Sequence, residues 1–84
     1  MFEILLERTA EKDLRRLTGI VHARVIKTIQ PLSTQPRPVG AKKLAGSKND
    51  WRIRVGDYRV LYEIAESIRI VRINRIRHRR DVYE

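Results

Sequence analysis

The chain has 84 residues, of which 42% are hydrophobic and 35% charged, and its formal net charge at pH 7 is +9. This length corresponds to one domain, residues 1–84, near the lower limit of what a single hydrophobic core stabilises. The absence of cysteine excludes disulfides and a cysteine-based zinc site, and His22 and His78 lie far apart in sequence, so we expect no metal and no cofactor.

Arginine supplies most of the positive charge, with fourteen of the nineteen basic residues. A domain this basic attracts polyanions, and the planar guanidinium suits two-point contacts with phosphate. Nucleic acid is therefore favoured as the partner over a surface that is only solvated. A membrane is not expected, because no basic amphipathic helix with an aromatic face is present. Without an apolar run of 18 residues or a signal-peptide pattern, the protein is expected to be cytoplasmic.

The N-terminal part of the chain predicts a strand and a short helix. Residues 2–7 form an apolar run bounded by charge, which is typical of a strand. Thr9 is a candidate N-cap for a helix whose apolar positions are Leu14 and Leu17. Gly19 is a natural residue at which to end it.

A second helical pattern starts at residue 20 and should end shortly before Pro31, which cannot continue a helix. The tight turn between the two helices predicts an antiparallel pair. A proline-containing loop over residues 33–40 then returns the chain across the domain. Lys42 and Lys43 follow it and are expected to face solvent or phosphate.

The most regular stretch, residues 51–64, predicts a β-hairpin with a two-residue turn at Gly56–Asp57. The pairs that follow from this turn are Val55 with Tyr58, Arg54 with Arg59, Ile53 with Val60, and Arg52 with Leu61. One face is then apolar and suits packing on the helices, whereas the other gathers three arginines. Like charges directly across a hairpin destabilise it, which points to a functional reason for them.

A turn at Glu66–Ser67 leads to the last strand, predicted to start at Ile68, in which β-branched residues alternate with arginine. The adjacent Ile70 and Val71 leave the faces of this strand open, since a bulge would exchange them. The predicted fold is α+β, with two N-terminal antiparallel helices packed on one face of a mainly antiparallel four-stranded sheet, in the order β-α-α-β-β-β.

The arginines of the hairpin and the basic end of the chain suit two kinds of chemistry. One is passive binding of phosphates, and the other is cleavage of RNA by attack of a ribose 2′-OH on the neighbouring phosphate. Cleavage needs a base, an acid and cations for the developing charge, and no metal. Histidine exchanges protons near neutral pH, which makes His78 a candidate, and Tyr83 could stack on a base. From these residues, catalysis and plain binding of nucleic acid or an acidic protein both remain open.

The chain resembles a known family in three segments: Lys43-Leu44-Ala45-Gly46, the hairpin Trp51-Arg52-Ile53-Arg54 with Tyr58-Arg59-Val60-Leu61-Tyr62, and the closing Arg77-His78-Arg79-Arg80-Asp81-Val82-Tyr83. Together with the element order, these look like the RelE/ParE superfamily of toxins from type II toxin–antitoxin systems, over nearly the whole chain.

The resemblance implies a RelE-like mRNA interferase, a metal-independent endoribonuclease that cleaves translated mRNA at the ribosome. The ParE branch, which inhibits DNA gyrase and lacks the basic catalytic set, is the alternative. An inactive member retained as a repressor partner of its antitoxin is a third reading. The resemblance also implies a cognate antitoxin with an acidic, amphipathic segment, which forms a hetero-oligomer with a toxin that is monomeric alone.

The family's two lysines on the first hairpin strand, one of them proposed as the base, fall on Arg52 and Arg54 here. Arginine keeps the phosphate contact but stays protonated and is a poor base. The resemblance to relatives with a histidine near the C-terminus therefore favours His78 over Arg54 as the base, with a positioning role for His78 as the alternative.

The arginine that stabilises phosphate falls on Arg59, and the stacking tyrosine falls on Tyr83. The family's later arginine, proposed as the acid, falls on Arg77 or Arg79 according to the alignment, and we assign it to Arg79. The expected catalytic residues are Arg52, Arg54, Arg59, His78, Arg79 and Tyr83, with RNA contacts from Lys42, Lys43, Arg75 and Arg77.

Overall fold

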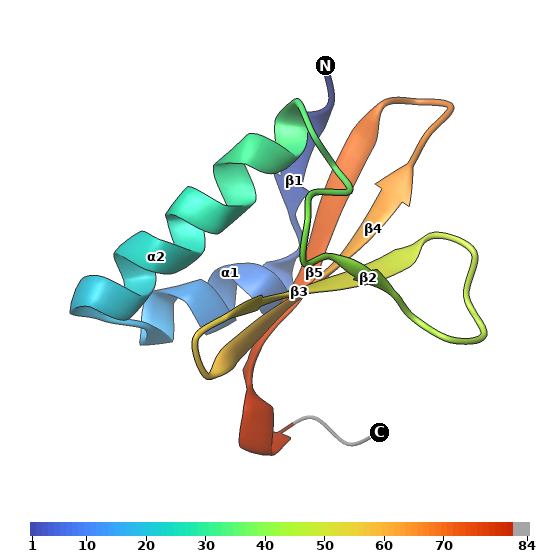
Figure 1. The fold of residues 1–84 in the computed structure, drawn as a ribbon. Helices are drawn as coiled ribbons and strands as arrows, with labels where there is room; N and C mark the ends of the chain where they lie inside the picture. The colour runs from blue at the N-terminus through green and yellow to red at the C-terminus, as the bar shows by residue number, and fades with distance from the viewer. Residues whose placement is uncertain (82–84) are drawn as a thin grey trace.

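Two helices cover one face of a five-stranded sheet in the computed structural model, which describes residues 1–81 (Figure 1). The elements are β1 (Glu3–Leu6), α1 (Arg8–Arg16), α2 (Gly19–Ile29), the 3-10 turn η1 (Gln30–Ser33), β2 (Lys42–Lys43), β3 (Asp50–Val55), β4 (Tyr58–Ala65), β5 (Ile70–His78) and the 3-10 turn η2 (Arg79–Asp81). The predicted α+β fold is confirmed, but the sheet has five strands where four were predicted. The additional strand, β2, has two residues and is too short to leave a periodic pattern.

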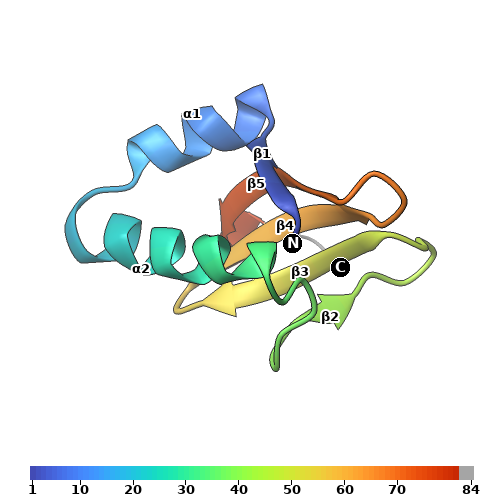
Figure 2. The same cartoon turned by 90° about the horizontal axis from the view of Figure 1, so that it is seen from above.

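The strands lie in the order β1-β5-β4-β3-β2. β1 runs parallel to β5, and every other neighbouring pair is antiparallel. The helices between β1 and β2 run in opposite directions, as predicted, and both lie on the same side of the sheet (Figure 2). α2 ends at Ile29, two residues before Pro31. None of the helices in residues 1–81 has the length and hydrophobicity to cross a membrane.

The central hairpin forms with the predicted register. Gly56 and Asp57 separate β3 from β4, and all four predicted pairs occur. Gly56 has a φ of 59°, a conformation that glycine adopts without steric cost. Because the turn fixes the register, Ile53, Val55, Val60, Tyr62 and Ile64 face the helices, whereas the arginines and Leu61 face the opposite side of the sheet.

A bulge in β5 decides which of its side chains face the helices. Leu61 pairs with Arg75 but Tyr62 pairs with Ile73, so Asn74 is an extra residue on β5. The bulge lies further along the strand than the Ile70–Val71 position considered from sequence. It shifts the alternation by one residue and brings Val71, Ile73 and Ile76 into the same core. The strand itself begins at Ile70, because Ile68 belongs to the preceding turn and is 61% exposed.

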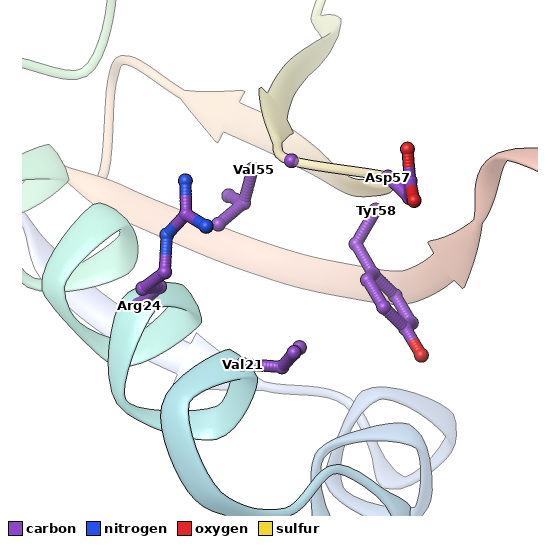
Figure 3. Close-up of a pocket in the computed structure, with 6 residues that line it drawn as sticks. Val21, Arg24, Val55, Asp57 and Tyr58 are labelled. Carbon is purple, nitrogen blue, oxygen red and sulfur yellow. The ribbon is translucent and has the colours of Figure 1, made fainter.

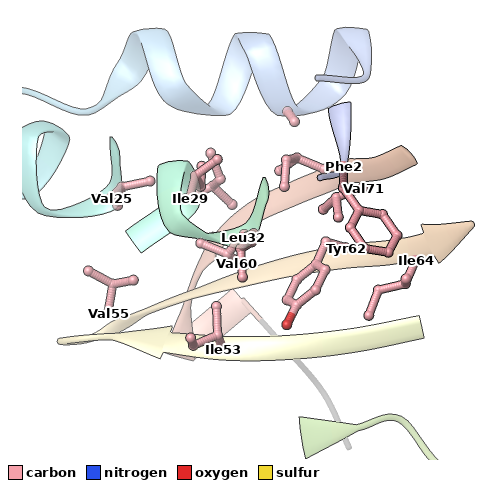
Figure 4. Packing of buried hydrophobic residues seen from close by; sticks show 13 residues of the cluster. Phe2, Val25, Ile29, Leu32, Ile53, Val55, Val60, Tyr62, Ile64 and Val71 are labelled. Carbon is pink, nitrogen blue, oxygen red and sulfur yellow. The ribbon is translucent and has the colours of Figure 1, made fainter. Parts of the chain in front are cut away.

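The core lies between the sheet and the two helices (Figure 4). Its buried members are Phe2, Ala10, Val25, Ile29, Leu32, Ile53, Val55, Val60, Tyr62, Ile64, Val71, Ile73 and Ile76. Tyr62 is fully buried, and its hydroxyl donates a hydrogen bond of 2.8 Å to the carbonyl of Pro36. This bond anchors the proline-containing loop to the centre of the sheet.

Helix α1 lies along the part of β5 that extends beyond β1. It begins at Arg8, with Glu7 at the N-cap, so Thr9 does not cap the helix as predicted. The Thr9 hydroxyl instead donates to the carbonyl of Asn74 at 2.8 Å. Since Asn74 is the bulged residue, the helix satisfies a backbone group that the irregular strand leaves outside its ladder.

Candidate nucleic-acid interface

Three arginines lie side by side on the sheet face opposite the helices. Arg54 of β3 pairs with Arg59 of β4, and Arg59 pairs in turn with Arg77 of β5. Adjacent strands are about 4.8 Å apart, so the three residues span roughly 10 Å of the sheet surface. These residues are called the arginine row below. The register predicted from the hairpin turn supplies two of its members, and the bulge in β5 supplies the third.

A second line of basic residues runs beside the arginine row on the same face. Lys42 pairs with Arg52, Arg52 with Leu61, and Leu61 with Arg75. The two lines together give this face a dense positive charge. Such a surface attracts a polyanion and can contact several of its phosphates at once.

The arginines of this face differ in whether a carboxylate neutralises them. Arg72 pairs with two carboxylates, with 3.2 Å between its Nε and Glu7 Oε2 and 3.0 Å between its Nη1 and Glu63 Oε1. Arg75 pairs with one, with 2.8 Å between its Nε and Asp13 Oδ2. Within residues 1–81, by contrast, neither Arg52 nor Arg54 nor Arg77 is within 4.0 Å of a carboxylate. The uncompensated charge is therefore concentrated toward the hairpin end of the sheet.

Asp13 is a structural residue that sequence reasoning missed. Its carboxylate is 8% exposed and accepts hydrogen bonds from Arg75 Nε at 2.8 Å, Arg75 Nη2 at 3.2 Å and the Ile76 backbone N–H at 2.9 Å. Burial alone would raise the pKa of Asp13, but these hydrogen bonds and the charges of Arg75 and Arg77 outweigh it and lower the pKa. Asp13 thus fixes β5 just before Arg77, and the guanidinium of Arg75, an expected RNA contact, is held by this carboxylate.

His78 lies on the other face of the sheet from the arginine row. It pairs with Tyr58, and the two rings meet edge to face with their centroids 5.1 Å apart. Tyr58 in turn packs against the core from the hairpin, where it faces Val21 and Arg24 of α2 across a hollow of about 220 Å³ (Figure 3). His78 Nδ1 accepts a hydrogen bond of 3.3 Å from the Arg80 N–H. The structure therefore does not bring His78 together with the arginines of the hairpin.

Three of the remaining expected site residues lie in η2, β5 and β2, and the fourth lies outside the described residues. Arg79 is exposed in η2, and its backbone N–H donates to the carbonyl of Asp57 at 2.7 Å. The guanidinium of Arg77 donates to the carbonyl of Asp81 at 2.9 Å, which ties η2 to the end of β5. Lys43 pairs with Trp51 and so alternates to the opposite face from Lys42. Tyr83 lies outside the described residues.

The chemistry available to this face is that of fixed positive charge. No group of three His, Asp or Glu side chains within residues 1–81 is arranged to hold a metal ion. Arginine side chains carry a fixed positive charge, so those of the arginine row can stabilise a phosphate whose negative charge increases during a reaction.

Comparison with known proteins identifies the family. The family model described as the ParE toxin of the type II toxin–antitoxin system parDE matches residues 4–83. Toxin RelE3 of Methanocaldococcus jannaschii is 31% identical to this chain, over 98% of this chain and 96% of the relative. Toxin RelG of Mycobacterium tuberculosis is 34% identical, over 98% of this chain and 95% of the relative.

Solved structures agree with this assignment. The toxin–antitoxin complex RelBE2 of Mycobacterium tuberculosis contains a chain that matches with a TM-score of 0.79 and 29% identity, over 92% of this chain and 96% of that one. The isolated RelE toxin of E. coli matches with a TM-score of 0.83 over 93% of this chain and 84% of that one, and at 20% identity this shows the shared fold. The chain therefore belongs to the RelE/ParE family of toxins from type II toxin–antitoxin systems.

Proposed function

We propose that this toxin is an mRNA interferase, which cleaves translated messenger RNA at the ribosome without a metal ion. The observation that carries the proposal is the concentration on one sheet face, around Arg59, of three cations that no carboxylate of residues 1–81 neutralises, Arg52, Arg54 and Arg77. A toxin that acts only through protein contacts has no need of like charges on directly opposed strand positions, which cost stability.

In the proposed reaction, the 2′-oxygen of one ribose attacks the adjacent phosphorus. The new O2′–P bond forms as the P–O5′ bond breaks, which leaves a 2′,3′-cyclic phosphate and a 5′-hydroxyl. The 2′-OH gives up its proton, and the departing 5′-oxygen takes one. Negative charge increases on the non-bridging oxygens in the transition state, and the arginine row stabilises this charge. Preorganised stabilisation of this kind is usually the largest contribution to an enzyme's rate enhancement.

The register supports Arg77 as the arginine of β5 that acts beside Arg59, because the two are direct partners. Arg79 then serves a neighbouring phosphate from η2, and Tyr83 stacks on a base. His78 remains the candidate for the proton transfers, although its contact with Tyr58 favours a positioning role. A His78→Gln variant distinguishes the two roles, because loss of a base lowers the maximal rate and changes its pH profile, whereas a positioning role leaves the pH profile in place.

We also propose that a cognate antitoxin with an acidic, amphipathic segment neutralises this toxin. Related toxins are found in complexes with an antitoxin, including the RelB–RelE complex of Methanococcus jannaschii, whose matching chain is 27% identical with a TM-score of 0.78. The exposed Ile20 at the start of α2 and the basic sheet face provide the apolar and charged contacts that such a segment needs. Co-purification with the product of the adjacent gene tests this proposal, and no complex at micromolar concentration would contradict it.

Expression in growing bacteria, with mapping of the 5′ ends of transcripts, tests the nuclease proposal. The wild type should arrest growth and cut a translated reporter mRNA, but not the same mRNA with its start codon removed. Arg54→Ala/Arg77→Ala should lower cleavage by at least about 10²-fold, because each removes a contact to the reacting phosphate. The matched control Arg8→Ala/Arg16→Ala removes the same charge from the surface of α1 and should cut normally. Growth arrest with intact mRNA would contradict the proposal.

Inhibition of DNA gyrase is the competing function, and the match to the ParE toxin family model favours testing it. In this case the basic face contacts protein or DNA and carries out no chemistry. A supercoiling assay with purified gyrase separates the two functions. Inhibition of supercoiling by the wild type, together with intact translated mRNA, would favour gyrase as the target.

A further inference from the structure

The open edge of β3 carries a groove that adjoins the arginine row at Arg54. β2 pairs only with Trp51 and Arg52, so within residues 1–81 no strand covers the outer side of β3, away from β4, from Ile53 onward. Figure 2 shows β2 and the loop that leads into it on the outer side of β3. A groove of about 530 Å³ lies there, lined by Thr28 of α2, Val39 and Gly40 of the loop, Lys42 of β2, and Arg52, Ile53 and Arg54 of β3. We call it the edge groove.

The backbone of Arg54 faces the edge groove. The carbonyl of Asp50 accepts a hydrogen bond of 2.8 Å from the Leu44 N–H, which places this carbonyl on the outer side of β3. Peptide groups alternate along a strand with a period of two, so those of Arg52 and Arg54 face the same side. Arg52 is paired with β2, whereas Arg54 lies beyond the last pair. The groove therefore offers one N–H donor and one carbonyl acceptor.

The side chains of the edge groove add charge and an apolar surface. Lys42, Arg52 and Arg54 are cations, and none of them is within 4.0 Å of a carboxylate in the described part of the chain. Val39 is fully exposed at the opposite wall. The volume falls within the range of small-ligand sites. Together these features match a nucleotide. The cations suit its phosphate, the N–H and carbonyl of Arg54 suit hydrogen bonds to its base, and the apolar wall suits a ring.

We infer that the edge groove binds one nucleotide of the RNA beside the scissile phosphate. Lys42 and Arg52 hold its phosphate, and the Arg54 peptide group meets a polar edge of its base. The inference rests on the proposed function, because Arg54 belongs both to the arginine row and to the groove. An RNA strand that crosses the arginine row at Arg54 reaches the groove with its next nucleotide. Lys42 thus determines how much a flanking nucleotide contributes to binding.

Binding of a length series of RNAs tests this inference. The probes are oligonucleotides with 2′-O-methyl riboses, which cannot be cleaved, extended one nucleotide at a time on the 5′ or the 3′ side of a fixed core. Fluorescence anisotropy with the wild type should show a step of about three- to tenfold in affinity for one added nucleotide, on one side only. Lys42→Gln should abolish the step, because Lys42 holds the phosphate of the added nucleotide. For the extended RNA it should also lower the slope of log Kobs against log salt by about 0.7.

Lys48→Gln is the matched control, since it removes the same charge from an exposed residue of the turn before β3 and should keep the step. Both lysines are exposed, so neither substitution should affect folding. Equal weakening of all RNA lengths by Lys42→Gln, or a smooth rise of wild-type affinity with length, would overturn the groove assignment and leave the proposed cleavage intact. If the wild type bound none of these RNAs, the groove assignment would fail together with direct RNA contact by the arginine row.

Discussion

The arginines on the sheet face opposite the helices serve either the fold or the proposed site. The two groups differ in whether a carboxylate of the described residues pairs with them. Arg75 is held by the buried Asp13, whereas Arg54 is exposed and faces another arginine. A substitution at Asp13 should therefore affect stability first, and one at Arg54 should affect RNA contact first.

Asp13→Asn should destabilise the fold by about 2 kcal/mol at pH 7. The substitution keeps the side-chain volume but removes the negative charge of the carboxylate, which accepts two hydrogen bonds from Arg75. The partial exposure of Arg75 limits the loss of stability. Because the pKa of Asp13 is lowered in the folded state, its contribution is present above about pH 4 and is lost as the pH falls through the folded pKa. Chemical denaturation from pH 7 down to pH 2 should show the difference between the two proteins shrinking below about pH 4.

Glu11→Gln is the control for this prediction, because Glu11 is 52% exposed and lies 4.0 Å from Arg15. Its effect should stay within about 0.5 kcal/mol at every pH. A difference between wild type and Asp13→Asn that is constant from pH 7 to pH 2 would show that the carboxylate charge of Asp13 does not contribute.

Arg54→Gln should weaken RNA binding while leaving the fold as stable as the wild type, or up to about 0.5 kcal/mol more stable. Arg54 and Arg59 are directly opposed, and like charges in this position repel each other. Thermal unfolding and RNA binding should be measured on the same preparations, with Arg16→Gln on α1 as the control of equal charge. A lower melting temperature for Arg54→Gln would show that the arginine is needed for the fold.

At the scale of elements, the loop before β2 is fixed to the sheet at two points. The Tyr62 hydroxyl donates to Pro36, and the guanidinium of Arg37 lies 5.4 Å from the ring centroid of Trp51 while it pairs with Glu66 at 2.9 Å. This loop forms one wall of the edge groove, so the core residue Tyr62 supports a surface feature.

Tyr62→Phe should cost about 1 kcal/mol at neutral pH, because the buried carbonyl of Pro36 loses its donor. Burial raises the pKa of Tyr62 to about 12, with a smaller opposing effect from the charge of Arg37. The unfolded chain therefore ionises this phenol first, and wild-type stability should fall as the pH rises from about 10 to 12.

Denaturation curves between pH 9 and pH 12 should show that this fall is smaller in Tyr62→Phe. The matched control is Tyr58→Phe, at a half-buried tyrosine on the same strand. An identical alkaline loss of stability in the wild type and in Tyr62→Phe would contradict the assignment.

The sequence predicts the hairpin fully and the last strand only in part, for a physical reason. A two-residue turn determines every pair that follows it, so Arg54 and Arg59 could be placed opposite each other from local pattern alone. The face of Arg77 depends instead on the bulge at Asn74, which arises because Val71, Ile73 and Ile76 all pack on the helices. The irregular spacing of these three apolar residues is the signal that could have revealed the bulge.

The bulge therefore decides whether Arg77 belongs to the candidate site. Without the extra residue, Arg77 would pair with Tyr58 and face the helices, while Ile76 would pair with Arg59. The prediction that groups His78 with the hairpin arginines is made without a register for the last strand. In the observed register, His78 and these arginines lie on opposite faces of the sheet. The Asp13–Arg75 contact joins residues 62 positions apart, and no local pattern indicates a contact of that kind.

At the scale of the whole molecule, positive charge exceeds what the fold can neutralise, and salt should act on stability and on RNA binding in opposite directions. A net charge of +9 on 84 residues produces self-repulsion in the compact state, which salt screens over about 10 Å at 0.1 M. Raising sodium chloride from 50 to 300 mM should therefore raise the melting temperature by a few degrees. Over the same range, RNA binding should weaken linearly on a log–log plot, because salt opposes the release of counterions from the phosphates.

The Asp13–Arg75 pair should change this response little, since Asp13 is buried and its interaction is weakly screened. Arg54→Gln/Arg77→Gln, by contrast, should flatten both dependences, because the two arginines contribute to the repulsion and to the phosphate contacts. Calorimetry and anisotropy on the same salt series provide the two measurements. If the variant flattened the stability response but kept the full RNA slope, the phosphate contacts would lie elsewhere on the surface, and the arginine row would no longer be the site of RNA binding.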